Sequence, residues 1–350
     1  MLSKLPFSCD YLEGCHPAIL ERLSNTNYQS CDGYGYDPFT LAARDKILQA
    51  CQAEGGEVFL LSGGTQANLI VISGLLRSYE GVLAPSTGHI NAHEGGAIEN
   101  GGHKVIGLPQ TLGKVKAEDV ENYLLNWNND ANHDHMVKPG MLYISQPTEY
   151  GTIYSLAELQ HLSYICRQYG IRLYCDGARL AYSLASRNND VSLADLARYC
   201  DVFYIGGTKC GALCGEAVVI REKNLIPHFF TIIKQHGGIL AKGRLLGIQF
   251  DELFTDDLYL RIGSSALDYA EMITECLKDN HYQLLFETPT NQIFVVMENH
   301  QLQRLSEYVS YSYWEPYDDE HTVIRLATSW ATRATDVRQL CTLLEELQNS

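Results

Sequence analysis

The sequence has no apolar run long enough to cross a membrane. A membrane-spanning helix needs about 18 consecutive apolar residues, and no stretch of this chain supplies them. The N-terminal residues Met1-Leu-Ser-Lys-Leu-Pro-Phe-Ser-Cys-Asp10 also lack the apolar segment of a secretion signal. We therefore expect no membrane span and a cytoplasmic location.

Positive charge is scarce as well. The chain carries 26 lysines and arginines against 42 aspartates and glutamates, which gives a formal net charge of −16 at pH 7. A surface of that sign repels the phosphates of nucleic acids and the headgroups of anionic lipids. We expect neither as a partner, and an anionic ligand must be held by donors placed locally around its site.

Cysteines at metal-binding or redox spacing are also missing. None of the eleven cysteines forms a Cys-x-x-Cys pair, and Cys210 and Cys214 have no matching histidines nearby. The count is odd, and several cysteines lie in apolar patterns, where cysteine acts as a small hydrophobic residue: Cys51, Cys166, Cys175, Cys200 and Cys276. The sequence therefore predicts reduced thiols and no metal.

What the sequence does contain is a regular alternation of strands and helices. From residue 55 to 220, short apolar runs bounded by turn residues alternate with helical patterns, which predicts a mostly parallel sheet covered by helices on both faces. The expected strands are 57–61, 81–84, 104–108, 141–145, 171–175, 202–205 and 216–220. The expected helices of this region include 117–127, 155–169 and 193–199, besides a helix that ends near residue 76.

After residue 222 the pattern changes. Helices are expected near 223–235, 240–254 and 257–279. A smaller unit follows, with strands near 282–287, 291–297 and 321–327 and helices at 299–310 and 335–347. A chain of 350 residues is longer than one core usually serves. We expect an N-terminal arm (1–40), a large domain (41–255) and a small C-terminal domain (256–350).

The stretch Asp201-Val-Phe-Tyr-Ile-Gly-Gly-Thr-Lys-Cys-Gly-Ala212 carries the strongest chemical signal. A buried strand ends there at two glycines and a threonine, so Lys209 would leave it at the edge where open α/β sheets bind ligands. A buried lysine loses its proton more readily than lysine in water and can then attack a carbonyl group. We predict that Lys209 binds pyridoxal phosphate as a Schiff base. The alternative is a surface lysine in a glycine-rich turn.

A second glycine turn precedes the first helix of the alternating region. Strand 57–61 runs into Ser62-Gly-Gly-Thr-Gln-Ala-Asn68, and a helix N-terminus after such a turn points backbone N–H groups and its positive dipole end at an anion. No Gly-Lys-Ser/Thr and no Gly-x-Gly-x-x-Gly follows the strand, which argues against a nucleotide-binding loop. This turn is the predicted phosphate cradle, with a plain tight turn as the alternative.

The run Thr87-Gly-His-Ile-Asn-Ala-His-Glu-Gly-Gly-Ala-Ile98 could imitate a metal site, because a histidine and a glutamate follow His89 four and five residues later. The run is rich in glycine and no third ligand of suitable spacing stands out, so a metal is not expected here. His89 could instead lie flat on an aromatic cofactor.

Two further strands end in polar residues, at Gln146-Pro-Thr-Glu-Tyr-Gly151 and at Asp176-Gly-Ala-Arg179. An aspartate that ends a buried strand can keep a pyridine nitrogen protonated, although such an aspartate is as often a helix cap. Right-handed crossovers bring the ends of parallel strands to one edge. We therefore expect one site built from Thr65, His89, Glu149, Asp176 and Lys209.

Together these motifs resemble the threonine aldolase and β-eliminating lyase family, within the aspartate-aminotransferase-like (fold type I) pyridoxal phosphate enzymes. The resemblance spans nearly the whole chain. It also rests on Asp10-Tyr-Leu-Glu-Gly-Cys-His-Pro17, Gly33-Tyr-Gly-Tyr-Asp37 and, most specifically, Asp176-Gly-Ala-Arg-Leu180. It implies an α/β fold with a mostly parallel central sheet flanked by helices and a smaller α+β C-terminal domain.

The resemblance also implies roles for single residues. Lys209 would be the Schiff-base lysine, Asp176 the partner of the pyridine nitrogen, and His89 the histidine stacked on the ring. The implied cofactor-binding residues are Gly63, Gly64, Thr65, His89, Asp176, Arg179, Lys209 and Lys242. The implied substrate-binding residues are Cys9, Tyr34, Arg179 and Arg325. The guanidinium fork of Arg325 would hold the α-carboxylate.

The chain departs from the family's pattern at two points. Cys9 precedes Asp10 where the family usually has a serine or asparagine, and Thr148-Glu-Tyr-Gly151 replaces the Thr-His-Asn-Gly run of many threonine aldolases. The second departure leaves open which base takes a proton from the substrate's hydroxyl group: Glu149, His89 or an ordered water. A carboxylate with an ordinary pKa near 4.3 is a weak base.

The activity implied is cleavage of the Cα–Cβ bond of L-threonine- or L-allo-threonine-type β-hydroxy-α-amino acids to glycine and an aldehyde. A β-eliminating lyase or an aminotransferase using the same cofactor is the alternative, and a non-catalytic relative is a more remote one. Family members are usually dimers or tetramers with shared sites. The tyrosine-rich loop 33–37 fits a homodimer or homotetramer of this kind.

Overall fold

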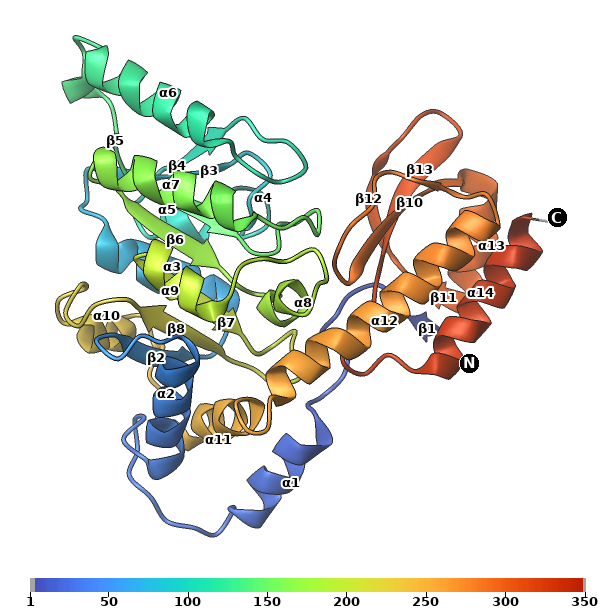
Figure 1. Ribbon diagram of the computed structural model, residues 1–350, viewed down its shortest axis with the longest axis horizontal. Helices are drawn as coiled ribbons and strands as arrows, with labels where there is room; N and C mark the ends of the chain where they lie inside the picture. Colours follow the sequence, from blue (N-terminus) through green and yellow to red (C-terminus); the bar gives the residue numbers. More distant parts are fainter. Residues whose placement is uncertain (1–3, 349–350) are drawn as a thin grey trace.

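Seven strands form the central sheet of the larger lobe in the computed structural model, which describes residues 4–348 (Figure 1). Across the sheet the order is β2-β8-β7-β6-β5-β3-β4. The bounds are β2 Glu57–Leu61, β3 Glu80–Pro85, β4 Val105–Leu108, β5 Lys138–Ser145, β6 Arg172–Asp176, β7 Val202–Gly206 and β8 Glu216–Ile220. Only β8 is reversed, because it pairs antiparallel with both β2 and β7. The other six strands therefore end at one edge of the sheet.

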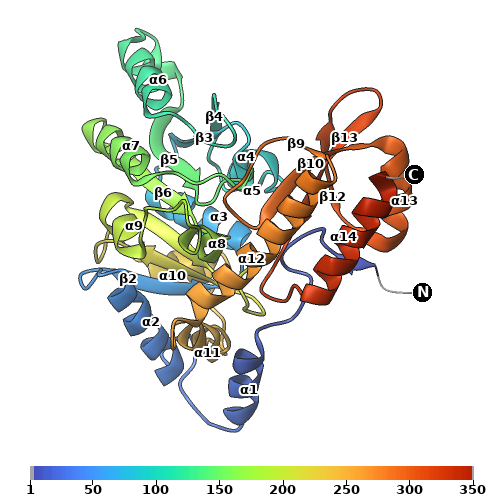
Figure 2. The same ribbon diagram turned by 45° about the vertical axis from the view of Figure 1, so that its right-hand side comes forward.

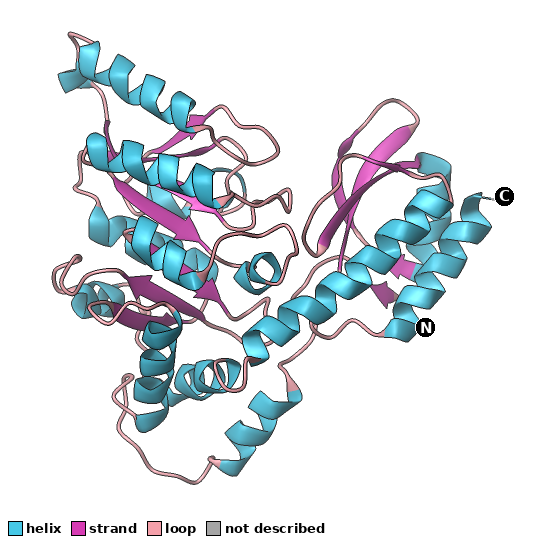
Figure 3. Cartoon of the chain, in the orientation of Figure 1, coloured by secondary structure: helices cyan, strands magenta, loops and turns pink. Residues whose placement is uncertain are grey.

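Helices cover both faces of this sheet (Figure 3). Successive strand residues face opposite sides, so Leu173 and Cys175 join one apolar cluster while Tyr174 joins another. The first cluster lies under α2 Pro38–Ala50, α6 Ala117–Asn129, α7 Leu156–Gln168, α8 Leu180–Leu184, α9 Leu193–Tyr199 and α11 Arg244–Leu253. The second lies under α3 Gly64–Leu75, α4 His89–Ala92, α5 Ala97–Asn100 and α10 Phe229–Gln235. Burial on both faces explains the continuous apolar runs of the strands.

The smaller lobe is an antiparallel sheet with helices on one side (Figure 2). Its strand order is β12-β13-β10-β9. The bounds are β9 Gln283–Leu284, β10 Gln292–Glu298, β12 Ser312–Pro316 and β13 His321–Ala327, and the helices are α12 Leu258–Asp279, α13 Asn299–Tyr308 and α14 Ala334–Gln348. Helix α12 links the lobes, because Ile262 packs in the core of the larger lobe and Ile273 in the core of the smaller one.

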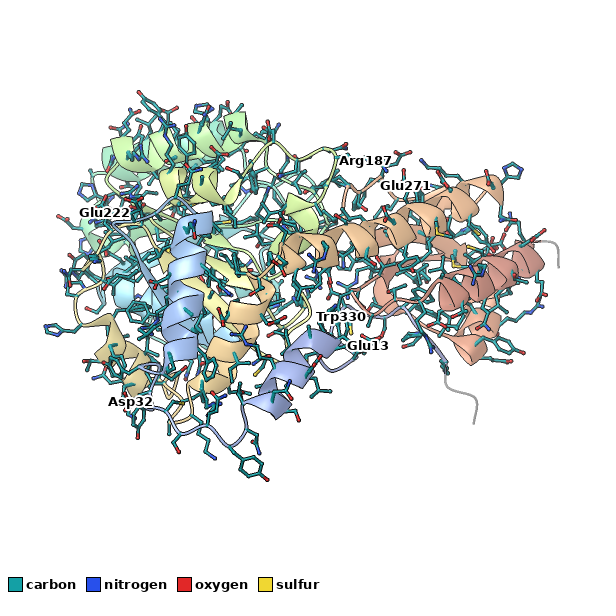
Figure 4. The ribbon with its side chains drawn as sticks, turned by 60° about the horizontal axis from the view of Figure 1, so that its bottom comes forward. Glu13, Asp32, Arg187, Glu222, Glu271 and Trp330 are labelled. Atoms are coloured by element: carbon teal, nitrogen blue, oxygen red, sulfur yellow. The ribbon has the colours of Figure 1, made fainter. Side chains whose placement is uncertain are left out.

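The N-terminal segment touches both lobes. Strand β1 (Leu5–Pro6) pairs with β11 (Val309–Ser310) in the smaller lobe, while helix α1 (Pro17–Asn25) packs on α11 of the larger lobe. Between them, the ring of His16 is 6.1 Å from that of Trp330, which is labelled in Figure 4. The division into an arm and two domains at residues 40 and 255 remains a proposal, since α12 belongs to both cores.

Most predicted elements are present, with differences that have local causes. The serine cap expected at residue 155 forms a full capping box with Glu158. Strand β9 is shorter than expected: only Gln283 and Leu284 pair with β10, and beyond them the ring of Phe286 stacks on that of Phe294. The elements that the sequence pattern did not reveal are short: β1, α4, α5, η1 (His133–His135), α8, β11 and β12.

Two structural findings concern membrane spans and metal sites. No helix between residues 4 and 348 is long and apolar enough to span a membrane. The same part of the chain contains no group of three or more histidine, cysteine, aspartate or glutamate side chains that could hold a metal, and all eleven cysteines are free.

Candidate active site

Two glycines bring the ends of β6 and β7 close enough to form one site. A Cβ atom on Gly177 would lie 2.0 Å from the carbonyl oxygen of Tyr204, and one on Gly206 would lie 2.3 Å from that of Ala178. The backbone N–H of Gly206 donates to the carbonyl of Gly177 at 2.9 Å. Only glycine permits this approach, which places Asp176 and the turn that carries Lys209 at the same edge.

Asp176 is a buried carboxylate surrounded by donors. Its Oδ2 accepts from the Tyr143 hydroxyl at 2.7 Å and from Asn68 Nδ2 at 3.1 Å, while its Oδ1 accepts from the Tyr204 hydroxyl. Burial alone would raise the pKa of Asp176, but the charge of His89 and these hydrogen bonds outweigh burial and lower the pKa below its usual 3.8. Asp176 is therefore ionised at neutral pH.

Lys209 lies in the turn after β7, half-buried, with its carbonyl accepting a 2.6 Å hydrogen bond from the Tyr182 hydroxyl. Burial, and then the nearby charge of Arg179, lower the pKa of Lys209 below 10.5, and the carboxylates of Asp10, Glu149 and Asp176 only partly oppose them. A larger fraction of the amine is neutral and nucleophilic as a result.

A second buried carboxyl group supports the turn that carries Lys209. Glu216, at the start of β8, accepts from the backbone N–H of Gly207 at 3.1 Å and from the Thr208 hydroxyl at 2.8 Å. Burial raises the pKa of Glu216 to about 8, against the opposing effect of the Thr208 hydrogen bond. This side chain holds the turn without a full negative charge at neutral pH.

His89 begins α4 and is fixed by Glu94. Its Nδ1 lies 2.6 Å from Glu94 Oε1, which also accepts from Asn68 Nδ2 at 2.9 Å. Burial works against a charged ring, but the hydrogen bond to Glu94 and the charges of Glu149 and Asp176 outweigh it and raise the pKa of His89 above 6.5. Asn68 therefore donates both to Glu94, which holds His89, and to Asp176.

These side chains line one cavity of about 370 Å³. The structure brings together all five residues that the sequence placed in one site: Thr65, His89, Glu149, Asp176 and Lys209. Gly63 and Gly64 line the same cavity at the N-terminus of α3, where the first N–H groups of a helix have no partners within the helix. A Cβ on Gly64 would lie 3.0 Å from the Tyr204 hydroxyl, so a side chain at this position would press on a tyrosine that supports Asp176.

A second cavity of about 530 Å³ adjoins the first and reaches the smaller lobe. It is lined from the smaller lobe by Ser312, Tyr313, Trp314, Glu315 and Arg325. Arg325 donates from Nη1 to Gln292 Oε1 at 3.0 Å and from Nη2 to Ser312 Oγ at 3.2 Å. Its guanidinium is therefore held in place at the wall of the cavity.

Arg179 lines both cavities, yet most of its guanidinium is already engaged. Its Nε donates to Asp10 Oδ2 at 2.7 Å and its Nη2 to Asp10 Oδ1 at 3.1 Å. Asn291 Nδ2, from the smaller lobe, donates to the same carboxylate at 2.9 Å. Burial would lower the pKa of Arg179, but Asp10 outweighs it and raises the pKa above 12.5. Among the hydrogen bonds of residues 4–348, none uses Nη1 of Arg179, which is therefore left for a ligand.

Three predicted residues lie outside both cavities of this chain. Cys9 is next to the site but not in it, beside Tyr11, which lines both cavities. Tyr34 is in the N-terminal arm, where Lys234 Nζ lies 4.4 Å from the centre of its ring. Lys242 is exposed before α11. For Tyr34 and Lys242, a contact with the site would have to come from another subunit.

The side chains that support the site were not among the predicted site residues: Asp10, Asn68, Glu94, Tyr143, Tyr204 and Glu216. Some of these left a signal. A tyrosine stands two residues before the end of β5, β6 and β7 alike, at 143, 174 and 204, which puts the three rings on one face. Glu216 is a lone carboxyl group at the start of an apolar strand. Nothing in the sequence paired Asp10 with Arg179.

The residues present fit pyridoxal phosphate. The α3 turn offers backbone donors to a phosphate, Asp176 offers a carboxylate to a ring nitrogen, His89 offers a ring face, and Lys209 offers a partly neutral amine to an aldehyde. All of them line the first cavity. Glu94 Oε2, next to His89, is a buried oxygen without a hydrogen-bond partner in the described part of the chain.

Comparison with known proteins first defines the class. Thermus thermophilus aspartate aminotransferase superposes with a TM-score of 0.72 at 12% identity, over 98% of this chain and 91% of that one. This likeness shows the fold, and the predicted aspartate-aminotransferase-like, fold type I architecture is confirmed. The chain therefore has the fold of the fold type I pyridoxal phosphate enzymes.

Closer relatives narrow the class to a family. The family described as beta-eliminating lyase matches residues 9–304, and the chain belongs to it. A solved structure of Leishmania major threonine aldolase matches with a TM-score of 0.95 at 39% identity, over 98% of this chain and 99% of that one. The low specificity L-threonine aldolase of Pseudomonas aeruginosa is 28% identical over 302 residues, which are 85% of this chain and 86% of the relative. The predicted family resemblance is confirmed.

Proposed function

We propose that this protein is a pyridoxal phosphate-dependent carbon–carbon lyase of the threonine aldolase type. Its substrates are β-hydroxy-α-amino acids such as L-threonine and L-allo-threonine, and its products are glycine and an aldehyde. The observation that carries the proposal is the cavity that joins Lys209, Asp176 and His89 to the glycine turn. The likeness to threonine aldolases along nearly the whole chain supports the choice of reaction.

Each predicted side chain has a task in this reaction. When bound, pyridoxal phosphate supplies a ring that withdraws electrons from the substrate's Cα. The ionised Asp176 would hold a protonated ring nitrogen, and the N-terminus of α3 would bind the phosphate. Lys209 would supply the amine for the aldehyde. His89, held by Glu94, would pack against the ring.

The substrate's carboxylate is oriented by arginines. Arg325 lies at the wall of the second cavity, and Nη1 of Arg179 adds a second positive donor between the two cavities. Fixing the carboxylate would fix the directions of the other bonds at the substrate's Cα, and with them the bond that is broken. Orientation of this kind is the protein's main contribution to choosing a reaction on a shared cofactor.

The test is product analysis on purified protein supplied with pyridoxal phosphate. L-Threonine and L-allo-threonine should each give glycine and acetaldehyde in equal amounts. Release of ammonia and a keto acid from serine or cysteine, without any aldehyde from either threonine, would contradict the proposal and indicate β-elimination. The family name beta-eliminating lyase makes this control necessary.

We also propose a cytoplasmic homo-oligomer in which a neighbouring subunit completes the site. Tyr34 and Lys242, implied by the family resemblance, lie outside both cavities of the single chain, and the loop around Tyr34 exposes Tyr28 and Tyr36 as well. Light scattering on the purified protein should give the mass of a dimer or tetramer. A monomeric mass would contradict this part of the proposal.

A further inference from the structure

The base that takes the proton from the substrate's β-hydroxyl group is not assigned by the proposed function, on which this inference rests. His89 is poorly suited to the task. Its Nδ1 lies 2.6 Å from Glu94 Oε1, and the surrounding carboxylates favour the protonated, charged form of the imidazole ring. Its ring face is also the surface offered to the cofactor. A second group near the same place must therefore accept the proton.

His93 lies at that place. It follows the last residue of α4, and its backbone N–H donates to the carbonyl of His89 at 2.8 Å. The centres of the two imidazole rings are 5.9 Å apart, with an angle of 54° between their planes. His89 is half-buried, whereas His93 is exposed.

The two cavities meet at His93. Six residues line both of them: Tyr11, His89, His93, Glu149, Arg179 and Lys209. The first cavity takes the cofactor and the second carries Arg325, so the substrate's Cα and Cβ must lie where the two join. Histidine is the side chain that accepts and releases protons most readily near neutral pH, and His93 is the histidine at this junction that no carboxylate holds among the described contacts.

We propose that His93 is a catalytic residue that accepts the proton of the substrate's β-hydroxyl group. As the O–H proton moves to the imidazole, the electron pair of that bond forms the aldehyde C=O. The Cα–Cβ bond breaks and leaves its electron pair on Cα, which is later protonated to give glycine. His93 is exposed, so it returns its proton to water before the next turnover.

Glu149 is the competing candidate, since it also lines both cavities. Its position corresponds to the histidine that the Thr-His-Asn-Gly run would supply. The charge of Glu149 acts on His89, whose pKa it helps to raise. The charge of Glu149 therefore acts electrostatically on His89, while the imidazole of His93 takes the proton.

Two reactions of the same enzyme distinguish a base at the β-hydroxyl group from a residue with a structural role. Cleavage of L-allo-threonine requires a base at the β-hydroxyl, whereas exchange of the α-proton of glycine in D₂O requires the cofactor and the carboxylate contacts but no hydroxyl base. For His93→Asn, we expect cleavage to fall about 100-fold or more, which is typical for loss of a general base, while glycine exchange changes by less than about 3-fold. Exchange is followed by proton NMR, and the visible spectrum of the bound cofactor should stay as in the wild type.

Matched variants complete the experiment. His135→Asn changes an exposed histidine in η1, outside both cavities, and should leave both reactions unchanged. Equal losses of cleavage and exchange in His93→Asn would mean a structural role and overturn the inference. It would also be overturned if Glu149→Gln, and not His93→Asn, selectively lost cleavage. A wild type that binds the cofactor and exchanges glycine but cleaves neither threonine would instead overturn the proposed function.

Discussion

Replacing Asp10 by alanine should destabilise the protein strongly, because it breaks a buried ion pair on one side only. The Asp10 carboxylate is 0% exposed and the Arg179 side chain 8%, with two hydrogen bonds between them at 2.7 and 3.1 Å. Removing one partner of such a pair leaves an uncompensated buried charge, which costs about 3–5 kcal/mol. Asn291 also loses the carboxylate to which it donates.

The double variant Asp10→Ala/Arg179→Met tests whether the loss of stability comes from an unpaired buried charge. When both charges are removed, no buried group is left unpaired, and an apolar side chain of similar length fills the space. The double variant should therefore be more stable than Asp10→Ala, although it carries one more substitution. If each substitution only removed contacts, the double variant would be less stable than Asp10→Ala.

Urea unfolding, followed by circular dichroism and by tryptophan fluorescence at a fixed pyridoxal phosphate concentration, measures these differences in the free energy of unfolding. Asp32→Ala is the control, because Asp32 is an exposed carboxylate of the same N-terminal segment (Figure 4). A loss below about 1 kcal/mol for Asp10→Ala, or a double variant less stable than the single one, would refute the argument.

The pH dependence of this ion pair has a definite sign. Burial would raise the pKa of Asp10, but Arg179, Lys209 and the hydrogen bonds outweigh burial and lower the pKa below 3.8. A carboxyl group whose pKa is lower in the folded state stabilises that state above its unfolded pKa and loses this effect as the pH falls through the folded pKa. The difference between wild type and Asp10→Ala should therefore be constant near neutral pH and shrink below about pH 4.

The remaining predictions concern the cofactor, the substrate and His89. Lys209→Ala should lose the visible chromophore that borohydride reduces while its circular dichroism stays that of a folded protein; a chromophore that persists and is reduced would contradict the role of Lys209. Arg325→Ala should raise KM about 10- to 100-fold with little change in kcat, since a charged hydrogen bond contributes about 1.5–3 kcal/mol, and an unchanged KM would show that another group binds the carboxylate. Glu94→Gln should lower the pKa of His89, measured by NMR titration of its ring, because the Glu94 hydrogen bond is the largest contribution that raises it. Stabilisation from the charged ring is present below its unfolded pKa and lost as the pH rises through the folded pKa, so Glu94→Gln should cost stability mainly on the acid side.

The strands, the large helices and the five residues of the site were predictable because their signals are local. An apolar run followed by glycine and a polar residue marks a strand end, and parallel topology brings such ends together without further information. The supporting residues were harder to find. In a strand buried on both faces, such as Val202–Gly206, every residue is apolar or small, so composition does not reveal that Tyr204 points toward Asp176.

Contacts between side chains far apart in the chain could not be predicted from the sequence, for a different reason. Asp10 and Arg179 are 169 residues apart, and Asp10 and Asn291 are 281 apart. No periodicity links positions in different elements, and each of these side chains alone is an ordinary surface-type residue. Strand β12 was missed similarly, since its residues Ser312–Pro316 are only half-buried or exposed and give no apolar run.

The N-terminal segment has a consequence for how the protein is made. The carbonyl of Ser8 accepts a hydrogen bond from Arg325, which lies 317 residues later in the chain. During synthesis on the ribosome, residues 5–10 are made about 300 residues before their partners on β11 and β13. The larger lobe can fold early around its own core, yet Asp10 reaches its final position only when the smaller lobe exists. Closure of the substrate pocket is therefore a late event, and a nascent chain stalled before residue 309 would lack a finished catalytic centre.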